Sequence, residues 1–292
     1  MLTTQGMLHL EKKANDIRES IISMLVEAKS GHTAGPLGMA DVFSALYFYS
    51  LKHDVKNPTW EERDRVVLSN GHICPVYYAT LAHAGYIPIE ELMTLRKFGS
   101  RLQGHPHREY LPLLENSSGP LGSGLSQAVG MAIATSPRMT GLRGTSADQP
   151  YIFCLMSDGE HDEGNTWEAI MLAGKEKLNN LIAIVDRNNI QIDGYTEDIM
   201  PLGDLAKKYE AFGWHAQEID GHNFEEIISA IDMAKAVFEK PSVIIARTIP
   251  GKGVKEFERD YTWHGKPPNK EEAEMALKEL RTLGGKILSE HE

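Results

Sequence analysis

Apolar positions in the first quarter of the chain predict helices followed by one buried strand. In Glu11–Lys29 they recur every three or four residues, at Ala14, Ile17, Ile21, Ile22, Leu25 and Ala28. This is the period of an amphipathic helix, and Gly31 is a suitable stop for it. A second helix is expected over Asp41–Ser50. The short apolar run Arg65–Ser69 predicts a buried strand, and a helix is expected to resume near Pro75.

The second half of the chain alternates between short apolar runs and amphipathic segments. Continuous apolar strands that alternate with helices are typical of an α/β fold, in which a parallel sheet is covered by helices on both faces. Ligands bind such sheets where strands end and helices begin. Strands are predicted at Tyr151–Met156, Leu181–Val185, Trp214–Ile219 and Ser242–Thr248, and helices at Thr166–Lys177, Leu202–Phe212, Phe224–Phe238 and the charged tail Lys270–Glu292.

Length and composition are those of an ordinary globular protein. The 292 residues are 41% hydrophobic and 24% charged, which is enough to bury a core without disulfides or a structural metal. We find no internal repeat and no linker, so residues 1–292 are expected to form a single domain. The net charge of −11 argues against a nucleic-acid surface. No apolar run reaches the roughly 18 residues that a membrane span needs.

Cysteine usage and the first residues bear on the compartment. Cys74 and Cys154 each lie in an apolar stretch and are expected to be buried, unpaired thiols. The segment Met1–Leu10 has neither a basic region nor a long apolar region, so it does not resemble a secretory signal. We therefore expect a cytoplasmic protein.

Polar residues follow two consecutive predicted strands. Asp158 and Gly159 come directly after Tyr151–Met156, within the cluster Ser157-Asp158-Gly159-Glu160. Asn188 comes directly after the next strand. In a parallel sheet both positions lie at the same edge, and a carboxylate with an amide oxygen suits Mg²⁺ that keeps other positions for water and phosphate oxygens. Either residue by itself is typical of an ordinary turn, but the pair is more specific.

A glycine-rich segment, Ser118–Gly124, precedes an apolar helix that is expected to run through Ala134. Glycines ahead of a helix whose first N–H groups are free can cradle a diphosphate. The alternative is a flexible loop, and the segment alone does not decide between them.

Four histidines stand next to glycines, in Gly31-His32, Gly71-His72, Gly104-His105 and His264-Gly265. Imidazoles exchange protons near neutral pH and bind sugar hydroxyls, so we interpret them as polar pocket residues. A metal site is the rival interpretation, above all at His105-Pro106-His107. No paired cysteines or second close pair of histidines in the sequence supports a zinc site.

Taken together, these stretches resemble transketolase, in the family's order and over nearly the whole chain. The matching sequences are GHTAGPLGMAD (Gly31–Asp41), SNGH (Ser69–His72), QGHP (Gln103–Pro106), SGPLGSGLSQAVGMA (Ser118–Ala132), SDGEHDEGNTWEA (Ser157–Ala169), VDRNNIQIDG (Val185–Gly194), TIPGKGV (Thr248–Val254) and WHG (Trp263–Gly265).

The resemblance implies an enzyme that binds thiamine diphosphate with Mg²⁺, which Ca²⁺ or Mn²⁺ could replace. Such enzymes move a two-carbon ketol unit from a ketose to an aldose, and the cofactor serves as the electron sink. By resemblance, the metal ligands are Asp158, Asn188 and the backbone carbonyl of Ile190. The positions expected to contact the cofactor are His72, Gly119, Pro120, Leu121, Gly159, Glu160, Asn188 and His264.

The resemblance also assigns the substrate channel and an interface. His32, His105 and His264 match histidines that line the channel, and pKa values near neutrality would suit them to proton transfer. Glu163 matches an acidic residue that pairs across the subunit interface. The family's Gly-Asp-Gly is Ser157-Asp158-Gly159 here, and the small serine is expected to be tolerated.

The chain is about half as long as a complete transketolase. The missing part resembles the pyrimidine-binding domain, which supplies the glutamate that activates the cofactor and most residues that hold the terminal phosphate of a sugar phosphate. We therefore expect a split enzyme: this diphosphate-binding subunit, a separate C-terminal subunit with the pyrimidine-binding domain, and a heterotetramer with two copies of each.

Two alternatives remain. One is a subunit of another two-chain thiamine enzyme, either a 2-oxo-acid dehydrogenase E1 component or an enzyme like deoxyxylulose-phosphate synthase. The other is a cofactor-binding relative without catalytic activity. The histidines of GHTAGPL and QGHP favour transketolase over the first, and the presence of Asp158, Asn188 and all four histidines speaks against the second. Neither the donor and acceptor sugars nor the choice between phosphate and sulfonate follows from the sequence.

Overall fold

A five-stranded parallel sheet forms the centre of the computed structural model, which describes residues 2–136 and 149–282. The strands lie in the order β1-β2-β3-β7-β6, and every neighbouring pair is parallel. The α/β fold predicted from the alternation is therefore confirmed. The strands are β1 (Arg65–Leu68), β2 (Ile152–Ser157), β3 (Leu181–Arg187), β6 (His215–Asp220) and β7 (Ser242–Arg247).

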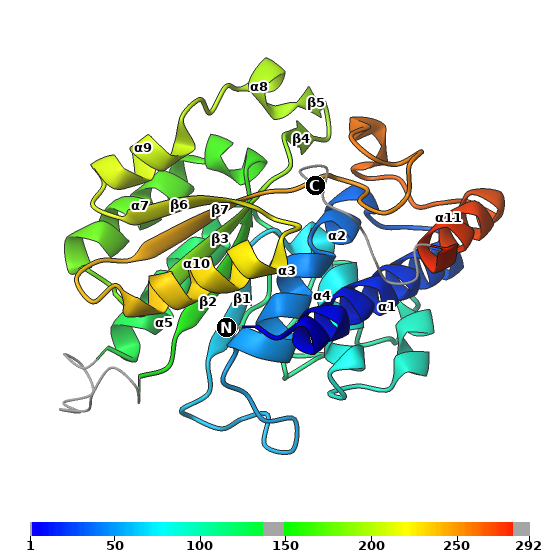
Figure 1. Cartoon of the computed structure of the whole chain (residues 1–292), viewed down its shortest axis with the longest axis horizontal. Helices are drawn as coiled ribbons and strands as arrows, with labels where there is room; N and C mark the ends of the chain where they lie inside the picture. The colour runs from blue at the N-terminus through cyan, green and yellow to red at the C-terminus, as the bar shows by residue number, and fades with distance from the viewer. Residues whose placement is uncertain (1, 137–148, 283–292) are drawn as a thin grey trace.

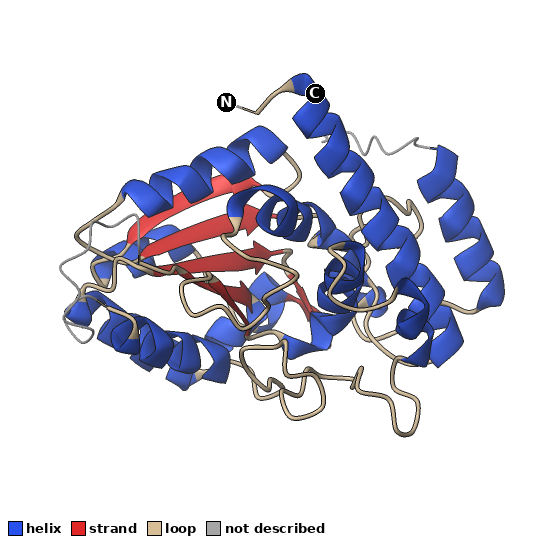
Figure 2. Cartoon of the chain, turned by 90° about the horizontal axis from the view of Figure 1, so that it is seen from below, coloured by secondary structure: helices blue, strands red, loops and turns tan. Residues whose placement is uncertain are grey.

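Helices cover both faces of this sheet, as Figure 2 shows. The strands are buried on both sides because their apolar side chains alternate between two separate cores. In β2, Phe153 and Leu155 join one core, whereas Ile152, Cys154 and Met156 join the other. The first core includes α3 (Ala40–Ala45), α4 (Cys74–His83) and α10 (Phe224–Ala236), and the second includes α5 (Ser123–Ala134), α7 (Gly164–Glu176) and α9 (Leu205–Ala211).

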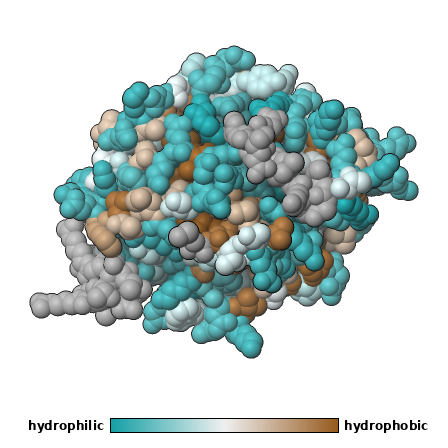
Figure 3. Space-filling model, viewed as in Figure 1, coloured by the Kyte–Doolittle hydropathy of each residue, from teal (hydrophilic) through white to brown (hydrophobic). Residues whose placement is uncertain are grey.

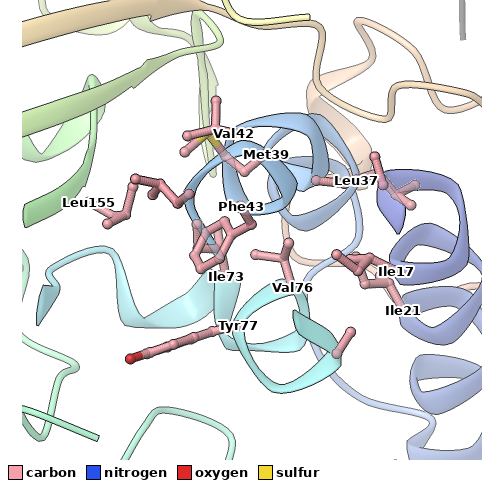
Figure 4. Close-up of a cluster of buried hydrophobic side chains, with 14 of the residues drawn as sticks. Ile17, Ile21, Leu37, Met39, Val42, Phe43, Ile73, Val76, Tyr77 and Leu155 are labelled. Carbon is pink, nitrogen blue, oxygen red and sulfur yellow. The ribbon is translucent and has the colours of Figure 1, made fainter. Parts of the chain in front are cut away.

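The first core extends into a helical layer built from the N-terminal part of the chain. Figure 4 shows apolar side chains from α1 (Thr4–Ala28), α2 (Ala34–Gly38), α3 and α4 meeting beside Leu155 of β2. A π-helical turn, Leu46–Ser50, continues α3. The C-terminal helix α11 (Lys270–Thr282) packs along α1 (Figure 1). This layer carries the segments that contain His32 and His72.

Capping residues shift two helix boundaries from those predicted. Helix α1 begins at Thr4 rather than Glu11, because the Thr3 hydroxyl accepts a hydrogen bond from Gly6 N–H. Helix α9 begins at Leu205 rather than Leu202, because Asp204 caps it. The tail is helical over Lys270–Thr282, and residues 283–292 lie outside the described part. Short elements that were not predicted include the helices α2 and α8 (Thr196–Ile199) and the two-residue strands β4 (Ile190–Gln191) and β5 (Gly194–Tyr195).

Both thiols are free and buried, as predicted. Burial raises the pKa of Cys74 to about 12, so this thiol is unreactive at neutral pH. Within the described residues, no helix has the length and apolarity needed to cross a bilayer.

A buried ion pair joins α1 to α3. Both guanidinium amino groups of Arg18 donate to the carboxylate of Asp41, at 3.0 and 2.6 Å. His222 Nδ1 lies 2.7 Å from the same carboxylate, and Ile249 N–H donates to His222 Nε2. Burial by itself would raise the pKa of Asp41, but Arg18 and His222 hold it at about 2. One carboxylate therefore connects the helical layer to the loop that follows β7.

The Asp41→Asn substitution should destabilise the fold strongly, because it leaves the fully buried Arg18 without its counter-ion. Loss of one partner from a buried pair costs about 3–5 kcal/mol. Urea unfolding should measure this loss, with Glu218→Gln as the control, because the exposed Arg247–Glu218 pair contributes only about 0–1 kcal/mol. An Asp41→Asn protein as stable as the control would contradict this role for the pair.

Candidate functional site

The polar residues predicted at two strand ends do lie side by side. Strands β2 and β3 are neighbours, and Ser157 is in register with Asp186. Asp158 N–H donates to the Asp186 carbonyl at 3.1 Å, and Asn189 N–H donates to Asp158 Oδ2 at 2.8 Å. The loop after β3 therefore wraps around the Asp158 carboxylate, as the adjacency of the two strand ends requires.

Asp158 is fully buried, and Arg187 is its cationic partner. Arg187 Nη1 donates to Asp158 Oδ2 at 3.0 Å, while its Nη2 reaches Glu197 at the edge of α8. Oδ1 accepts only the Gly159 N–H, at 2.7 Å. Burial raises the pKa of Asp158 to about 6, and the attraction of Arg187 limits the rise. Sequence reasoning missed this role of Arg187, although the residue stands inside the motif VDRNN.

Asn188 and Ile190 line the same loop. Asn188 Nδ2 donates to Asp186 Oδ2 at 2.8 Å, and its Oδ1 accepts the Ile190 N–H at 3.0 Å. The amide oxygen therefore keeps one lone pair for another ligand. No group of three histidine, cysteine or acidic residues suited to a metal occurs in the described ranges. The predicted set is of another kind, with one carboxylate, one amide oxygen and one carbonyl.

The buried carboxylate of Glu160 holds three loops together. Its Oε2 accepts the Ser69 hydroxyl at 2.7 Å and the Gly122 N–H at 2.8 Å. Its Oε1 accepts the Ser157 N–H at 3.0 Å. Burial without a cationic partner raises the pKa of Glu160 to about 7, although these hydrogen bonds oppose the rise. Because both carboxylate oxygens accept these hydrogen bonds, the side chain of Glu160 positions the three loops. Its contact with the cofactor stays a prediction.

The glycine-rich segment approaches the end of β1 closely. A Cβ on Gly124 would lie 2.5 Å from Ser69, and one on Gly71 would lie 2.4 Å from the Ser118 hydroxyl. Gly122 has a left-handed φ of 79° and leads into α5. At Gly119, by contrast, a Cβ would meet no atom within 4 Å, so open space adjoins that backbone. The loop is packed on one side and open on the other, which is the form of a ligand cradle.

Several buried polar atoms around this cradle lack hydrogen-bond partners among the described residues. They are both amide atoms of Asn70, the hydroxyls of Ser118 and Ser157, and Nδ1 of His32. Unpaired buried polar groups are costly, so their concentration here indicates that a polar ligand completes them. The residues present therefore fit a diphosphate group with a metal ion.

Three of the four predicted histidines meet in one cluster. The ring centroid of His32 lies 5.0 Å from that of His72 and 5.3 Å from that of His264, and the His72 and His264 centroids are 5.1 Å apart. Gly265 packs beside them, because its Cβ would lie 3.8 Å from His32 Nε2. His105 is exposed and makes no ring contact with the three, but its charge acts on His32 and His72. Segments 31–32, 71–72 and 264–265 thus converge from distant parts of the chain.

The pKa of each of these histidines is lowered from the usual imidazole value. Burial, followed by the charges of His264 and Arg96, lowers the pKa of His32 to about 3. Burial also lowers the pKa of His72 and His264. At His105 the burial is partial, and together with the charge of Arg96 it lowers the pKa. The cluster is therefore neutral at pH 7, so its imidazoles can accept as well as donate hydrogen bonds.

Glu163 lies outside this cluster, exposed at the N-cap position of α7. Met171 and Leu172 on the same helix are also exposed, by 56 and 40%. The predicted place of Glu163 at an interface is compatible with this exposed, partly apolar surface of α7.

Comparison with known proteins identifies the family. Residues 10–284 match the family model described as transketolase, thiamine diphosphate binding domain. The chain belongs to the transketolase family. The 6-deoxy-6-sulfo-D-fructose transketolase subunit of Clostridium sp. strain MSTE9 is 43% identical over 96% of this chain and 99% of that relative. An apulose-4-phosphate transketolase subunit of Actinobacillus succinogenes is 39% identical over 93% of this chain and 96% of that relative.

Full-length transketolases match only in part of their length. Transketolase 1 of Escherichia coli is 41% identical over 90% of this chain but 40% of its own. The crystal structure of transketolase from Campylobacter jejuni superposes with a TM-score of 0.86 and 38% sequence identity, over 93% of this chain and 42% of that chain. This chain thus spans nearly all of two subunit relatives and about two fifths of these complete transketolases, which agrees with a transketolase-type enzyme subunit.

We expect both Asp158→Ala and Asn188→Ala to abolish Mg²⁺-dependent binding of thiamine diphosphate, because each removes an oxygen at the adjacent strand ends. Calorimetric titration of the complex with its partner subunit would measure the affinity. Gln191→Ala is a suitable control, because the side-chain amide of Gln191 donates an exposed hydrogen bond to Asp162 and makes none to Asp158 among the described residues. Unchanged cofactor affinity in both variants would refute the assignment of these ligands.

Proposed function

We propose that this chain is the diphosphate-binding subunit of a two-chain transketolase that transfers a two-carbon ketol unit from a ketose donor to an aldose acceptor. The observation that carries the proposal is the placement of the histidine cluster beside a cradle with unpaired polar atoms. Family membership and the near-complete match to two transketolase subunits support it.

The strand-end residues would hold the cofactor. Asp158 through Oδ1, Asn188 through its amide oxygen and Ile190 through its carbonyl are the proposed Mg²⁺ ligands. The segment Gly119–Leu121, with Gly159 and His72, is the proposed diphosphate contact. Thiamine diphosphate, when bound, supplies the nucleophilic carbon and the electron sink for breaking a carbon–carbon bond. The protein contributes binding, orientation and exclusion of water.

The histidines would handle the sugar. When the donor's carbon–carbon bond breaks, a hydroxyl loses its proton, and the acceptor's carbonyl oxygen later gains one. Neutral imidazoles of His32 and His264 can accept a hydrogen bond from such a hydroxyl, and His32 Nδ1 has no other described partner. His105, exposed at the rim, is proposed to contact the sugar as it enters.

The proposed substrates are ketoses and aldoses with an anionic end group, pentose phosphates among them. The two subunit relatives are named for a sulfonated ketose and a sugar phosphate, which supports this class without choosing within it. A cytoplasmic location belongs to the same proposal, and the two free thiols agree with a reducing compartment.

The proposed partner is a C-terminal subunit with the pyrimidine-binding domain, in a heterotetramer of two copies of each chain. Exposed apolar side chains support such an interface. They include Ile192, Tyr195, Ile199 and Met200, all in the segment that follows β3. Apolar patches lie among polar ones on the face shown in Figure 3.

A cavity beside this segment adds to the proposed interface. Its volume is about 540 Å³, and Trp167, Leu202 and Phe212 line it next to Met200. Glu163, near this region on α7, is the proposed acidic interface residue.

The isolated chain should fold but transfer no ketol unit, because the glutamate that activates the cofactor is expected on the partner. The test supplies the purified chain with Mg²⁺, thiamine diphosphate and a ketose phosphate plus an aldose phosphate, with and without the partner subunit. Transfer should occur only when both chains are present.

Two controls make this test specific. The partner alone should be inactive, and the partner combined with the Asp158→Ala chain should remain inactive. Turnover by the chain alone, with host transketolase excluded, would overturn the two-chain proposal. A reconstituted complex that binds cofactor but transfers nothing would overturn the proposed activity.

A further inference from the structure

Arg96 joins the two segments that carry His32 and His105. Its Nη1 donates to the Ser30 hydroxyl at 3.0 Å, and its Nη2 donates to the Gly104 carbonyl at 3.1 Å. Ser30 is two residues before His32, and Gly104 directly precedes His105. The guanidinium therefore lies at the rim of the histidine pocket, held by one acceptor on each side.

The backbone around this arginine is specialised to place it there. Arg96 has a left-handed φ of 58°, which is uncommon for a residue other than glycine. A Cβ on Gly104 would lie 2.7 Å from Arg96 Cζ, so a larger residue at position 104 would displace the guanidinium from this stretch of backbone. Residues held in uncommon backbone conformations cluster at functional sites, although Lys29 and Lys177 adopt the same conformation as helix C-caps.

The charge of Arg96 is not compensated within the described residues, where no carboxylate pairs with it. Its neighbours differ, because Lys97 pairs with Glu27 and Arg101 pairs with Glu91. The side chain is exposed, and its two described hydrogen bonds go to uncharged acceptors. Of the five N–H bonds of a guanidinium, three remain for another ligand. An exposed guanidinium without a carboxylate partner among the described residues thus lies beside the segments that carry His32 and His105.

We propose that Arg96 is a specificity-determining residue that binds the anionic end group, a phosphate or a sulfonate, of the sugar substrate. This inference rests on the proposed transketolase function and deepens it. Most determinants of this anion are expected on the partner subunit, and Arg96 adds one on this chain. A planar guanidinium can donate two parallel hydrogen bonds to a tetrahedral oxyanion, and Arg96 has N–H groups left for this after its bonds to Ser30 and Gly104.

The test compares three ketose donors that share one carbon skeleton and end in a hydroxyl, a phosphate or a sulfonate. It uses the complex of the chain with its partner subunit. In Arg96→Gln, kcat/KM for the anionic donors should fall about ten- to hundredfold, mainly through KM, which is the usual loss for a hydrogen bond to a charged group. The neutral donor should change by less than about threefold.

The conservative variant separates charge from geometry. Arg96→Lys keeps the charge without the fork and should retain part of the preference for anionic donors. A loss restricted to the phosphate or to the sulfonate donor would identify which anion Arg96 recognises. Inorganic phosphate should also inhibit the wild-type complex more strongly than the Arg96→Gln complex.

Arg101→Gln is the matched control, because Arg101 lies in the same segment but pairs with Glu91. It should leave the preference unchanged. An equal loss for all three donors in Arg96→Gln would indicate a structural brace and contradict the inference, as would no loss at all. A wild-type complex that transfers no ketol unit from any donor would instead contradict the proposed function, and the inference with it.

Discussion

The arrangement of the site depends on one buried carboxylate, that of Glu160. It accepts hydrogen bonds from the end of β1, from the turn before α5 and from the end of β2. These three segments come from positions far apart in the sequence, and each contributes residues to the cradle. No cation among the described residues pairs with the carboxylate, so these hydrogen bonds stabilise it, and losing one would leave a buried oxygen or N–H unpaired.

Electrostatics divides the site into a buried neutral part and a charged rim. Burial keeps the His32, His72 and His264 cluster neutral, so these imidazoles offer both donors and acceptors to sugar hydroxyls. Charge occurs in the buried Asp158–Arg187 pair and at the exposed Arg96. The chain as a whole is acidic, so the proposed preference for anionic substrates rests on the local position of Arg96 and not on net charge.

The sequence predicted much of this architecture because its signals are local. Short apolar runs alternating with amphipathic helices indicated the parallel sheet, and consecutive strands placed Asp158 beside Asn188. Features that depend on tertiary contacts were not predictable. The role of Arg187 needs its distance to Asp158, and the low pKa of His32 needs its burial among other imidazoles. Strands β4 and β5 are two residues long, too short for any periodicity to reveal. Which of the predicted histidines meet likewise depended on the fold, which left His105 at the rim.

The most direct test of the central role of Glu160 is calorimetric titration of thiamine diphosphate, at fixed Mg²⁺, into complexes carrying wild-type or Glu160→Gln chains. Glutamine has the same shape but presents an NH₂ group to a backbone or hydroxyl donor. At least one of the hydrogen bonds that Glu160 accepts from Ser69, Gly122 and Ser157 is therefore lost. We expect a Kd higher by on the order of tenfold with the fold retained, as judged by circular dichroism. An unchanged Kd in a folded Glu160→Gln complex would contradict the claim that this carboxylate shapes the cofactor site.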